Sequence, residues 1–288
     1  MFGPDTRSFA WASVTKLATA LAVLVAAEEG TLALDDPAGP PGATVRHLLA
    51  HASGLGPRSG PPLAPPAVNR IYSNAGYLVL GDLIAERSGM SFADYLREGV
   101  LGPLGMTGTL LDTADADKAE GAAAAGLAGP LVDLLSLGRE LATPTLIGGE
   151  THRMATSVQF PGLGGVLPGF RRFEPCDWGL GPEIRGAKQP HWTGTENSPA
   201  TFGHFGRSGS FLWVDPVAGV ACAGLSDRSF GPWAARSWPA LADSVLEEQA
   251  GRRAGPDRSR PVGGDRSGRA GSGSGVGERT EHPGGGHV

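Results

Sequence analysis

The sequence predicts an α+β fold, in which an antiparallel sheet with flanking helices stands beside a helical lobe. Two observations lead to this prediction. Stretches with helical periodicity fill the first half of the chain, whereas short strand-like runs are concentrated between residues 201 and 225. Helices followed by a late antiparallel hairpin, rather than alternating regularly with strands, are typical of α+β proteins.

The helical segments begin with a long apolar stretch. Residues 13–29 contain no helix breaker, are apolar on nearly every side and end at Gly30, so they predict a helix buried within the protein. Residues 112–126 are rich in Ala, Asp and Gly and are expected to form a surface excursion. Further helices are expected at residues 45–51, 76–88, 91–101, 130–141 and 233–249.

The strand signal is carried by residues 201–207, 209–214 and 217–225. An Asp215-Pro216 turn joins the last two runs, which predicts an antiparallel hairpin. Residues 155–200 combine Gly, Pro and aromatic residues with few periodic stretches, so we expect short strands and long loops there.

The composition divides the chain into one domain and a tail. Residues 1–250 hold the periodic segments and predict a single domain. Residues 251–288 are Gly, Arg, Ser and Pro without periodicity, which predicts a disordered tail. Cys176 and Cys222 fit no metal or redox spacing; we favour two small buried hydrophobic residues and leave a disulfide open.

The formal net charge of −5 argues against nucleic acid or an anionic membrane as a partner, because either requires a basic face. Residues 17–27 resemble a signal-peptide core, but they are too short to span a bilayer and fit the buried helix better. We therefore expect a cytoplasmic protein that acts on a small molecule or a peptide. An extracytoplasmic location is the alternative if the natural N-terminus lies upstream.

The first chemical motif is Ser13-Val14-Thr15-Lys16, at the start of the long apolar helix. A serine and a lysine three residues apart share one helix face, and the N–H groups of a helix N-terminus favour negative charge. Apolar surroundings lower the pKa of a lysine amine, so Lys16 can accept the proton of a nucleophilic Ser13. The alternative is an N-capping serine and a lysine that reaches solvent.

The second motif is Tyr72-Ser73-Asn74. A tyrosine close to Lys16 would act as a general base or proton relay, and Asn74 would hydrogen-bond both Lys16 and a substrate amide. The alternative is a turn in which Ser73 and Asn74 satisfy backbone groups.

The third motif is His204-Phe205-Gly206, at the entrance to a strand-like run. An edge strand at a cleft can pair with an extended substrate, and a glycine lets the two backbones approach closely. The strand context distinguishes this copy from His282-Pro283-Gly284 in the tail, which has the same form.

Taken in order, the three motifs resemble the signature of the penicillin-binding-like serine hydrolases, which include class C β-lactamases, D-alanyl-D-alanine carboxypeptidases and lactamase-like esterases. The segments SVTKLATAL, HLLAHASGL and LWVDP are also similar to family segments, so the resemblance covers roughly residues 5–249. It implies a β-lactamase/transpeptidase-like fold, hydrolysis of an ester or amide, and neither a cofactor nor a metal.

The resemblance also implies a role for each motif residue. Ser13 is the nucleophile of an acyl-enzyme mechanism, and Lys16 and Tyr72 are its catalytic partners. The backbone N–H groups of Ser13 and Arg207 form the oxyanion hole, where each donor is worth about 3 kcal/mol. The residues implied at the substrate and the oxyanion are Asn74, His204, Gly206 and Arg207.

Two features depart from the family pattern. His204 replaces the lysine that true β-lactamases usually carry, which shifts the expectation toward esterase or D-peptidase activity, with Arg207 as a substitute charge. Only twelve residues precede Ser13, whereas family members usually have a helix and two sheet strands there. We therefore expect a truncated and marginally stable chain, whose sheet lacks its N-terminal strands.

Two further interpretations compete with a hydrolase. A non-catalytic family member would keep the fold and serve as a binding or scaffold protein, as the short N-terminus favours. The second interpretation is a zinc site at His47 and His51, since these two histidines share a helix face. The sequence shows neither the glutamate of a His-Glu-x-x-His motif nor a third ligand, so we expect both histidines to brace a loop instead.

Overall fold

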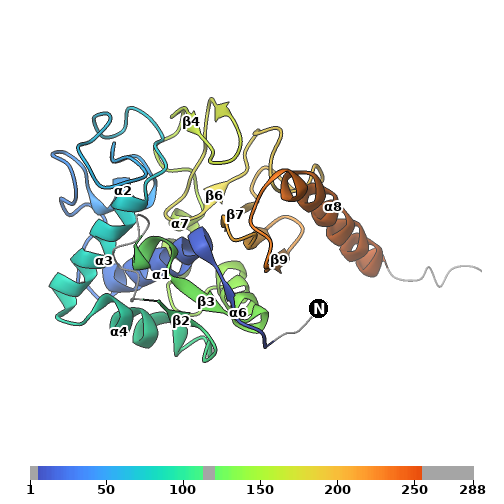
Figure 1. Ribbon diagram of the computed structural model, residues 1–288, viewed down its shortest axis with the longest axis horizontal. Helices are drawn as coiled ribbons and strands as arrows, with labels where there is room; N and C mark the ends of the chain where they lie inside the picture. Colours follow the sequence, from blue (N-terminus) through green and yellow to red (C-terminus); the bar gives the residue numbers. More distant parts are fainter. Residues whose placement is uncertain (1–5, 113–120, 255–288) are drawn as a thin grey trace, which may run out of the picture.

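The computed structural model describes residues 6–112 and 121–254 (Figure 1). The first half is mainly helical and the strands of the largest sheet come late, as predicted. The elements in chain order are β1 (Phe9–Ala10), the 3-10 turn η1 (Ala12–Val14), α1 (Thr15–Glu28), α2 (Val45–Leu49), α3 (Asn74–Ser88), α4 (Phe92–Leu96), the π-helical turn η2 (Arg97–Leu101), β2 (Leu110–Leu111), α5 (Ala122–Ala125), β3 (Leu127–Gly129), α6 (Leu131–Ala142), α7 (Gly149–Ala155), β4 (Gly165–Val166), β5 (Arg172–Phe173), β6 (Glu183–Ile184), β7 (Phe202–Phe205), β8 (Phe211–Asp215), β9 (Val220–Gly224) and α8 (Pro232–Ala254).

Helix α1 forms the centre of the molecule. Every side chain from Thr15 to Ala26 is buried, as the apolar residues on all sides of this helix predict. In Figure 1, α3 and α4 lie on one side of α1, and the strands of the large sheet lie on the other. The helix that begins next to Ser13 is therefore held by both halves of the fold.

The large sheet is antiparallel, with the strand order β6-β7-β8-β9. Strand β8 is buried on both faces, and its side chains alternate between two hydrophobic clusters. Leu212 and Val214 pack into the cluster built around α1. Phe211 and Trp213 pack into an aromatic cluster with Trp238 of α8. The sheet is thus enclosed between the helical lobe and α8.

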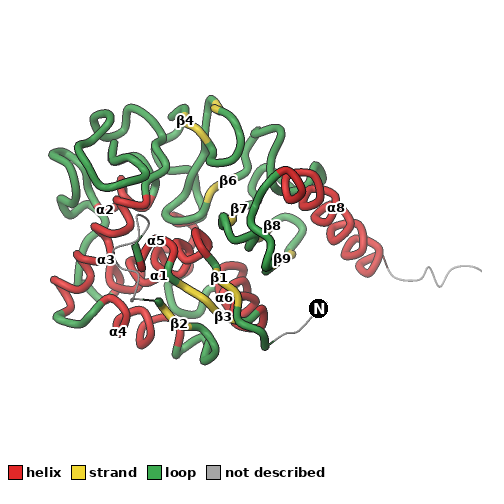
Figure 2. The backbone as a smooth tube through the Cα atoms, viewed as in Figure 1, coloured by secondary structure: helices red, strands yellow, loops and turns green. Residues whose placement is uncertain are grey.

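The strand predictions near residues 201–225 are confirmed as β7, β8 and β9, with Phe211 opposite Gly224 and Asp215 opposite Val220 in the hairpin. Between β4 and β7 the chain is mostly loop (Figure 2), also as predicted. A smaller sheet has the order β1-β3-β2, so β1 does not join the large one. Cys176 is buried, Cys222 is half-buried, and both are free thiols.

The structure differs from the sequence predictions in two segments, residues 121–126 and residues 251–254. The end of the expected surface excursion forms helix α5, and its Ala123 and Ala124 are buried because this helix packs against α1 and α3. Residues 113–120 of that segment lie outside the described residues. Helix α8 continues past Gly251 to Ala254, into the start of the predicted tail; the rest of that tail, 255–288, is also outside the described residues.

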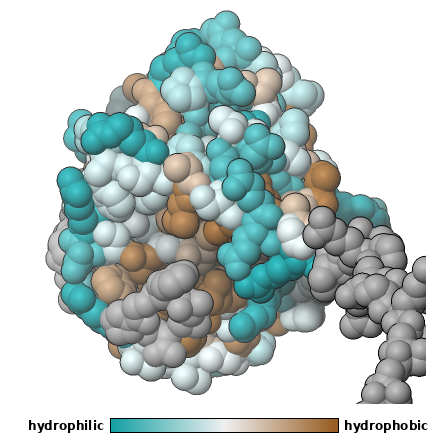
Figure 3. Space-filling model, turned by 90° about the vertical axis from the view of Figure 1, so that its right-hand side faces the viewer, coloured by the Kyte–Doolittle hydropathy of each residue, from teal (hydrophilic) through white to brown (hydrophobic). Residues whose placement is uncertain are grey.

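The surface is mixed. On the face that bears α8, hydrophobic residues appear in separate patches among hydrophilic ones (Figure 3). Within the described part of the chain, none of the helices has the length and apolar character needed to cross a membrane.

Candidate active site

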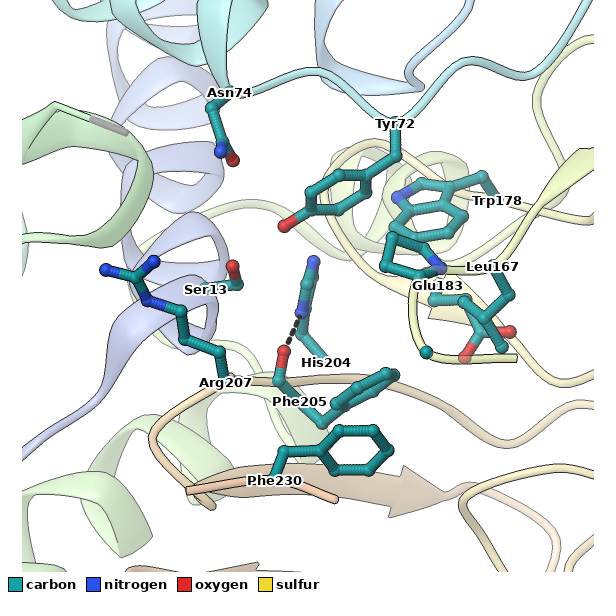
Figure 4. A pocket seen from close by; sticks show the side chains of 12 residues that line it. Ser13, Tyr72, Asn74, Leu167, Trp178, Glu183, His204, Phe205, Arg207 and Phe230 are labelled. Atoms are coloured by element: carbon teal, nitrogen blue, oxygen red, sulfur yellow. Dashed lines mark hydrogen bonds between the residues drawn. The ribbon is translucent and has the colours of Figure 1, made fainter. Parts of the chain in front are cut away.

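Ser13 lies in the turn η1, which leads directly into α1. Ala12, which precedes it, has a left-handed backbone conformation with φ 46°, a state that costs a residue with a side chain on the order of 1–3 kcal/mol. Neither Trp11 nor Val14, the residues at the cap positions of η1 and α1, makes a side-chain cap, and Ser13 occupies neither position. The N-cap interpretation of Ser13 is therefore wrong, and its hydroxyl points toward Tyr72 (Figure 4).

Lys16 is fully buried, at 0% exposure, so the interpretation in which its amine reaches solvent is also wrong. Its Nζ donates hydrogen bonds to Asn74 Oδ1 (2.7 Å) and to the Ala124 carbonyl (2.8 Å). The same amine lies 4.9 Å from the ring centroid of Tyr72 and 5.3 Å from that of Tyr77. The structure thus brings together the lysine, tyrosine and asparagine of the first two motifs.

The segment from α5 to β3 positions the start of α1, a role the sequence did not indicate. The Thr19 hydroxyl donates to the Ala123 carbonyl (2.7 Å), and the Thr15 hydroxyl accepts from the Leu127 N–H (3.0 Å). Together with the bond from Lys16, these contacts hold three successive polar side chains of α1 on one partner segment. Polar groups buried in this way are stable only because they are hydrogen-bonded.

The second motif combines both interpretations made from the sequence. Ser73 is the N-cap of α3: its hydroxyl accepts from the Gly76 N–H (2.8 Å), and its own N–H donates to His51 Nδ1 (3.1 Å). The turn interpretation is therefore correct for Ser73. Its neighbours Tyr72 and Asn74 line the pocket described below.

The third motif packs against the turn that carries Ser13. Gly206 donates its N–H to the Ser210 carbonyl (2.8 Å), and the Ser210 hydroxyl donates to the Trp11 carbonyl (2.6 Å). A Cβ on Gly206 would lie well inside contact distance of both the Ser210 hydroxyl and the Trp11 carbonyl oxygen. A glycine is required here because the end of β7 approaches the η1 backbone so closely.

Replacing this glycine is expected to displace the nucleophile. In Gly206→Ala the new methyl group pushes η1 and the β7–β8 hairpin apart. We expect kcat/KM for any ester substrate to fall by about 10²-fold, because small misplacements of reacting groups cost that much. Gly149→Ala is the matched control, since its Cβ would meet only a side-chain atom at ordinary distance. Equal activity of the two variants would contradict the prediction.

The two peptide groups implied in the oxyanion hole have fixed orientations. The Ala12 carbonyl accepts a hydrogen bond from the first N–H of α1, and the Gly206 carbonyl accepts from the Gly209 N–H (3.0 Å). Because a trans peptide is planar, with its C=O and N–H on opposite sides, the N–H groups of Ser13 and Arg207 point away from those bonds. Local backbone structure therefore sets the direction of both donors.

A pocket of about 200 Å³ lies beside Ser13 (Figure 4). The predicted site residues among its lining are Ser13, Tyr72, Asn74, His204 and Arg207. The remaining walls are mainly apolar, and the sequence assigned them no role; they include Leu167, Pro168, Trp178, Phe205 and Phe230. Such a lining suits an apolar group with a few fixed polar contacts.

Sequence reasoning also missed Glu183, whose carboxylate borders the pocket at 2% exposure. It accepts hydrogen bonds from Trp192 Nε1 (2.7 Å) and contacts Lys188 Nζ (2.9 Å) and His191 Nε2 (3.0 Å). Burial raises the pKa of this carboxyl, but the charges of His191 and Lys188 outweigh burial and hold the pKa far below its usual range. The scarcity of lysine, with three in the chain, was the available signal that Lys188 is not incidental.

Two buried histidines surround the Tyr72 ring. His51 lies 4.6 Å from it and His204 5.8 Å, centroid to centroid. Burial, reinforced by the charge of Lys16, lowers the pKa of His51 well below its ordinary value and that of His204 to about 3. Both rings are therefore neutral at pH 7.

This burial makes the fold sensitive to acid. Below pH 6.5, the ordinary value, both histidines bind a proton in the unfolded chain, whereas in the folded chain they do not. The free energy of unfolding then decreases on acidification, by up to about 1.4 kcal/mol per pH unit for each histidine. Urea denaturation at pH 7.5, 6.5 and 5.5 checks this, and His204→Gln should reduce the slope. Unchanged stability down to pH 5.5 would contradict it.

The sequence predicts that His47 and His51 support a loop rather than bind zinc, and both histidines make hydrogen bonds of that kind. His47 Nδ1 completes a capping box with Thr44 at the start of α2. His51 Nδ1 accepts from Ser73, one residue after Tyr72. His51 thus joins the two ends of the loop between α2 and α3, whereas His47 caps the start of α2.

An α+β fold, with a Ser-x-x-Lys pair at the start of its central helix and a Tyr-x-Asn motif beside it, defines the class of the penicillin-binding-like serine hydrolases. The model of the Beta-lactamase family matches residues 2–247. The chain belongs to this family.

Three individual proteins illustrate the similarity. A β-lactamase of Mycobacterium bovis, of known crystal structure, is 51% identical, with a TM-score of 0.83 over 86% of this chain and 89% of that one. Penicillin-binding protein 4* of Bacillus subtilis (strain 168) is 34% identical over 134 residues, and a putative D-alanyl-D-alanine carboxypeptidase of Escherichia coli (strain K12) is 26% identical over 203. These matches cover 35% and 58% of this chain, and 30% and 47% of the two curated relatives.

Proposed function

We propose that this chain is a serine hydrolase that cleaves an ester or an amide through an acyl intermediate on Ser13. The observation that carries the proposal is the Lys16 amine. It is fully buried, is held by Asn74 Oδ1 and the Ala124 carbonyl, and lies over the Tyr72 ring. An amine withdrawn from water next to a phenol is suited to moving the proton of a nucleophile.

The reaction has two similar halves. Ser13 Oγ attacks the carbonyl carbon while its proton passes to the pair formed by Tyr72 and Lys16. The electron pair of the C=O bond moves to the oxygen, where the N–H groups of Ser13 and Arg207 stabilise it. Collapse of this intermediate breaks the bond to the leaving group, which takes up the proton. A water molecule then attacks the acyl group by the same route and restores Ser13.

The names of the relatives support β-lactams and D-alanyl peptides as candidate substrates, beside the simple esters that we also propose. His204 favours an esterase or D-peptidase over a β-lactamase. A neutral histidine provides no permanent charge for a carboxylate, unlike a lysine.

Turnover of a substrate panel tests the proposal. The purified chain is assayed with p-nitrophenyl esters of different acyl lengths, with D-amino-acid p-nitroanilides and with the β-lactam nitrocefin. We expect hydrolysis of at least one ester or amide above the rate of the Ser13→Ala variant. If no substrate is turned over and none acylates the protein, the hydrolase proposal fails, and a binding or scaffold protein of the same fold replaces it.

A further inference from the structure

His51 holds the backbone on both sides of Tyr72. Its carbonyl accepts a hydrogen bond from the Ile71 N–H (2.9 Å), and its ring Nδ1 accepts one from the Ser73 N–H (3.1 Å). Because an N–H group only donates, Nδ1 carries no proton, and in the neutral ring the proton is on Nε2. One residue thus fixes both neighbours of the tyrosine in the chain.

The ring of His51 also supports the ring of Tyr72. The two centroids are 4.6 Å apart, with the planes tilted by 39°. Trp178 lies edge-on to His51 at 4.9 Å and Tyr77 lies at 5.2 Å, and the histidine is 0% exposed. A ring packed this closely cannot move away from Tyr72 without displacing its other neighbours. The tyrosine hydroxyl is thereby held on the side that faces Ser13 (Figure 4).

This arrangement is costly at His51 itself. Its backbone is left-handed, with φ 52°, a conformation that is uncommon for a residue with a side chain. Its Nε2 is buried without a hydrogen-bond partner among the described residues, which is rare in native proteins. Backbone strain persists only where the surroundings impose it, and it is concentrated at functional sites. Both features occur at a residue in contact with Tyr72, which points to a role in the reaction.

The loop between α2 and α3 has other anchors besides His51. The Arg70 guanidinium donates to the carbonyls of Ala50 (2.5 Å) and Cys176 (3.0 Å). The Ala67 N–H donates to the Ala52 carbonyl (2.8 Å). These bonds hold the loop without the histidine ring, so the contacts of that ring act on Tyr72 more than on the loop as a whole.

We propose that His51 is a positioning residue for the proton transfer at Ser13. It acts through Tyr72, by fixing the backbone and the ring of the tyrosine so that the hydroxyl faces the nucleophile. The described lining of the pocket does not include His51, so it contributes to the rate of the reaction and not to substrate binding. This inference rests on the function proposed above and adds a residue to its mechanism.

The maximal rate at which a fluorophosphonate labels Ser13 tests the inference, because it reports the activation of the nucleophile for any natural substrate. His51→Gly keeps the left-handed backbone but removes the acceptor and the ring, and should lower the rate constant about 10²-fold. His51→Asn also suits that backbone and places an amide oxygen where Nδ1 lies, so it should recover at least about tenfold of the loss. The probe concentration that gives half the maximal rate should change by no more than about twofold.

Thermal unfolding verifies that each variant folds. His51→Gln is a second variant without the acceptor: it fills more of the space of the ring, but its amide reaches the position of Nε2, so it should lose rate as the glycine variant does. His47→Ala is the matched control, since His47 caps α2 and stacks on Phe160. It should keep the labelling rate within about twofold. An equal loss in His47→Ala, or equal rates in folded His51→Asn and His51→Gly, would overturn the inference.

A double-mutant cycle with Tyr72→Phe tests whether His51 acts through Tyr72. Tyr72→Phe alone should lower the labelling rate, and adding His51→Gly should then lower it by no more than about twofold further. Two losses that multiply, or no loss in Tyr72→Phe, would refute the inference while labelling of Ser13 in the parent still supports the hydrolase. A parent that is not labelled on Ser13 refutes the hydrolase proposal, and the inference with it.

Discussion

Replacing Ser13 by alanine should lower kcat/KM on the order of 10⁶-fold for every ester or amide that the chain hydrolyses, because no other group takes the place of the nucleophile. The side chain makes no capping bond for η1 or α1. The variant should therefore unfold at nearly the same temperature as the parent. Initial rates with the best p-nitrophenyl ester, together with a thermal melt, provide both measurements.

Ser8 offers the matched control. It lies only five residues away, is exposed, and precedes β1. Ser8→Ala should keep full activity. A Ser13→Ala protein that is folded and still active, or a Ser8→Ala protein that is inactive, would contradict the assignment of the nucleophile.

Replacing Lys16 by methionine should reduce kcat/KM by about 10²–10⁴-fold, the usual contribution of a positioned acid or base. Methionine fills a similar volume, so the helix remains packed. It leaves Asn74 Oδ1 and the Ala124 carbonyl without this donor, which should cost about 1–3 kcal/mol of stability. Steady-state kinetics and urea denaturation separate the two effects.

Thr19→Val is the control for the structural part of that loss. Its hydroxyl makes an equivalent buried bond from α1 to α5, at the Ala123 carbonyl. We expect a comparable loss of stability with activity retained within about tenfold, because Thr19 does not line the pocket. If both variants lose activity equally, Lys16 acts only by holding α5 in place.

Most of the fold was accessible from the sequence because its signals are local. Residues 13–29 are apolar on nearly every side, and a helix with this pattern is stable only in the interior of a protein. The short apolar run 211–214 predicts a strand, and both faces of that strand are buried. Helix α5 was missed because a helix of four alanines has no periodicity. Its burial depends on Lys16 and Thr19, which are more than 100 residues away.

For a similar reason the sequence predicted that residues of the first two motifs lie together. The spacing from Ser13 to Lys16 fixes a shared helix face, and the burial of Lys16 then follows from its neighbours. The state of His204 was not accessible. Its neutrality arises from burial, reinforced by the charge of Lys16, and sequence spacing carries no such information. Glu183 escaped notice because Lys188 and His191, its partners, come from an irregular loop.

The central claim is that the acyl group is carried by one particular hydroxyl. The most direct test is to trap the chain with a fluorophosphonate or a slowly hydrolysed ester, digest it with trypsin and locate the adduct by tandem mass spectrometry. The peptide of residues 8–16 contains both Ser8 and Ser13, so the fragment ions distinguish them. The account predicts one adduct per chain, on Ser13, and none in Ser13→Ala. An adduct on Ser8 or on another peptide, with Ser13 unmodified, would contradict it.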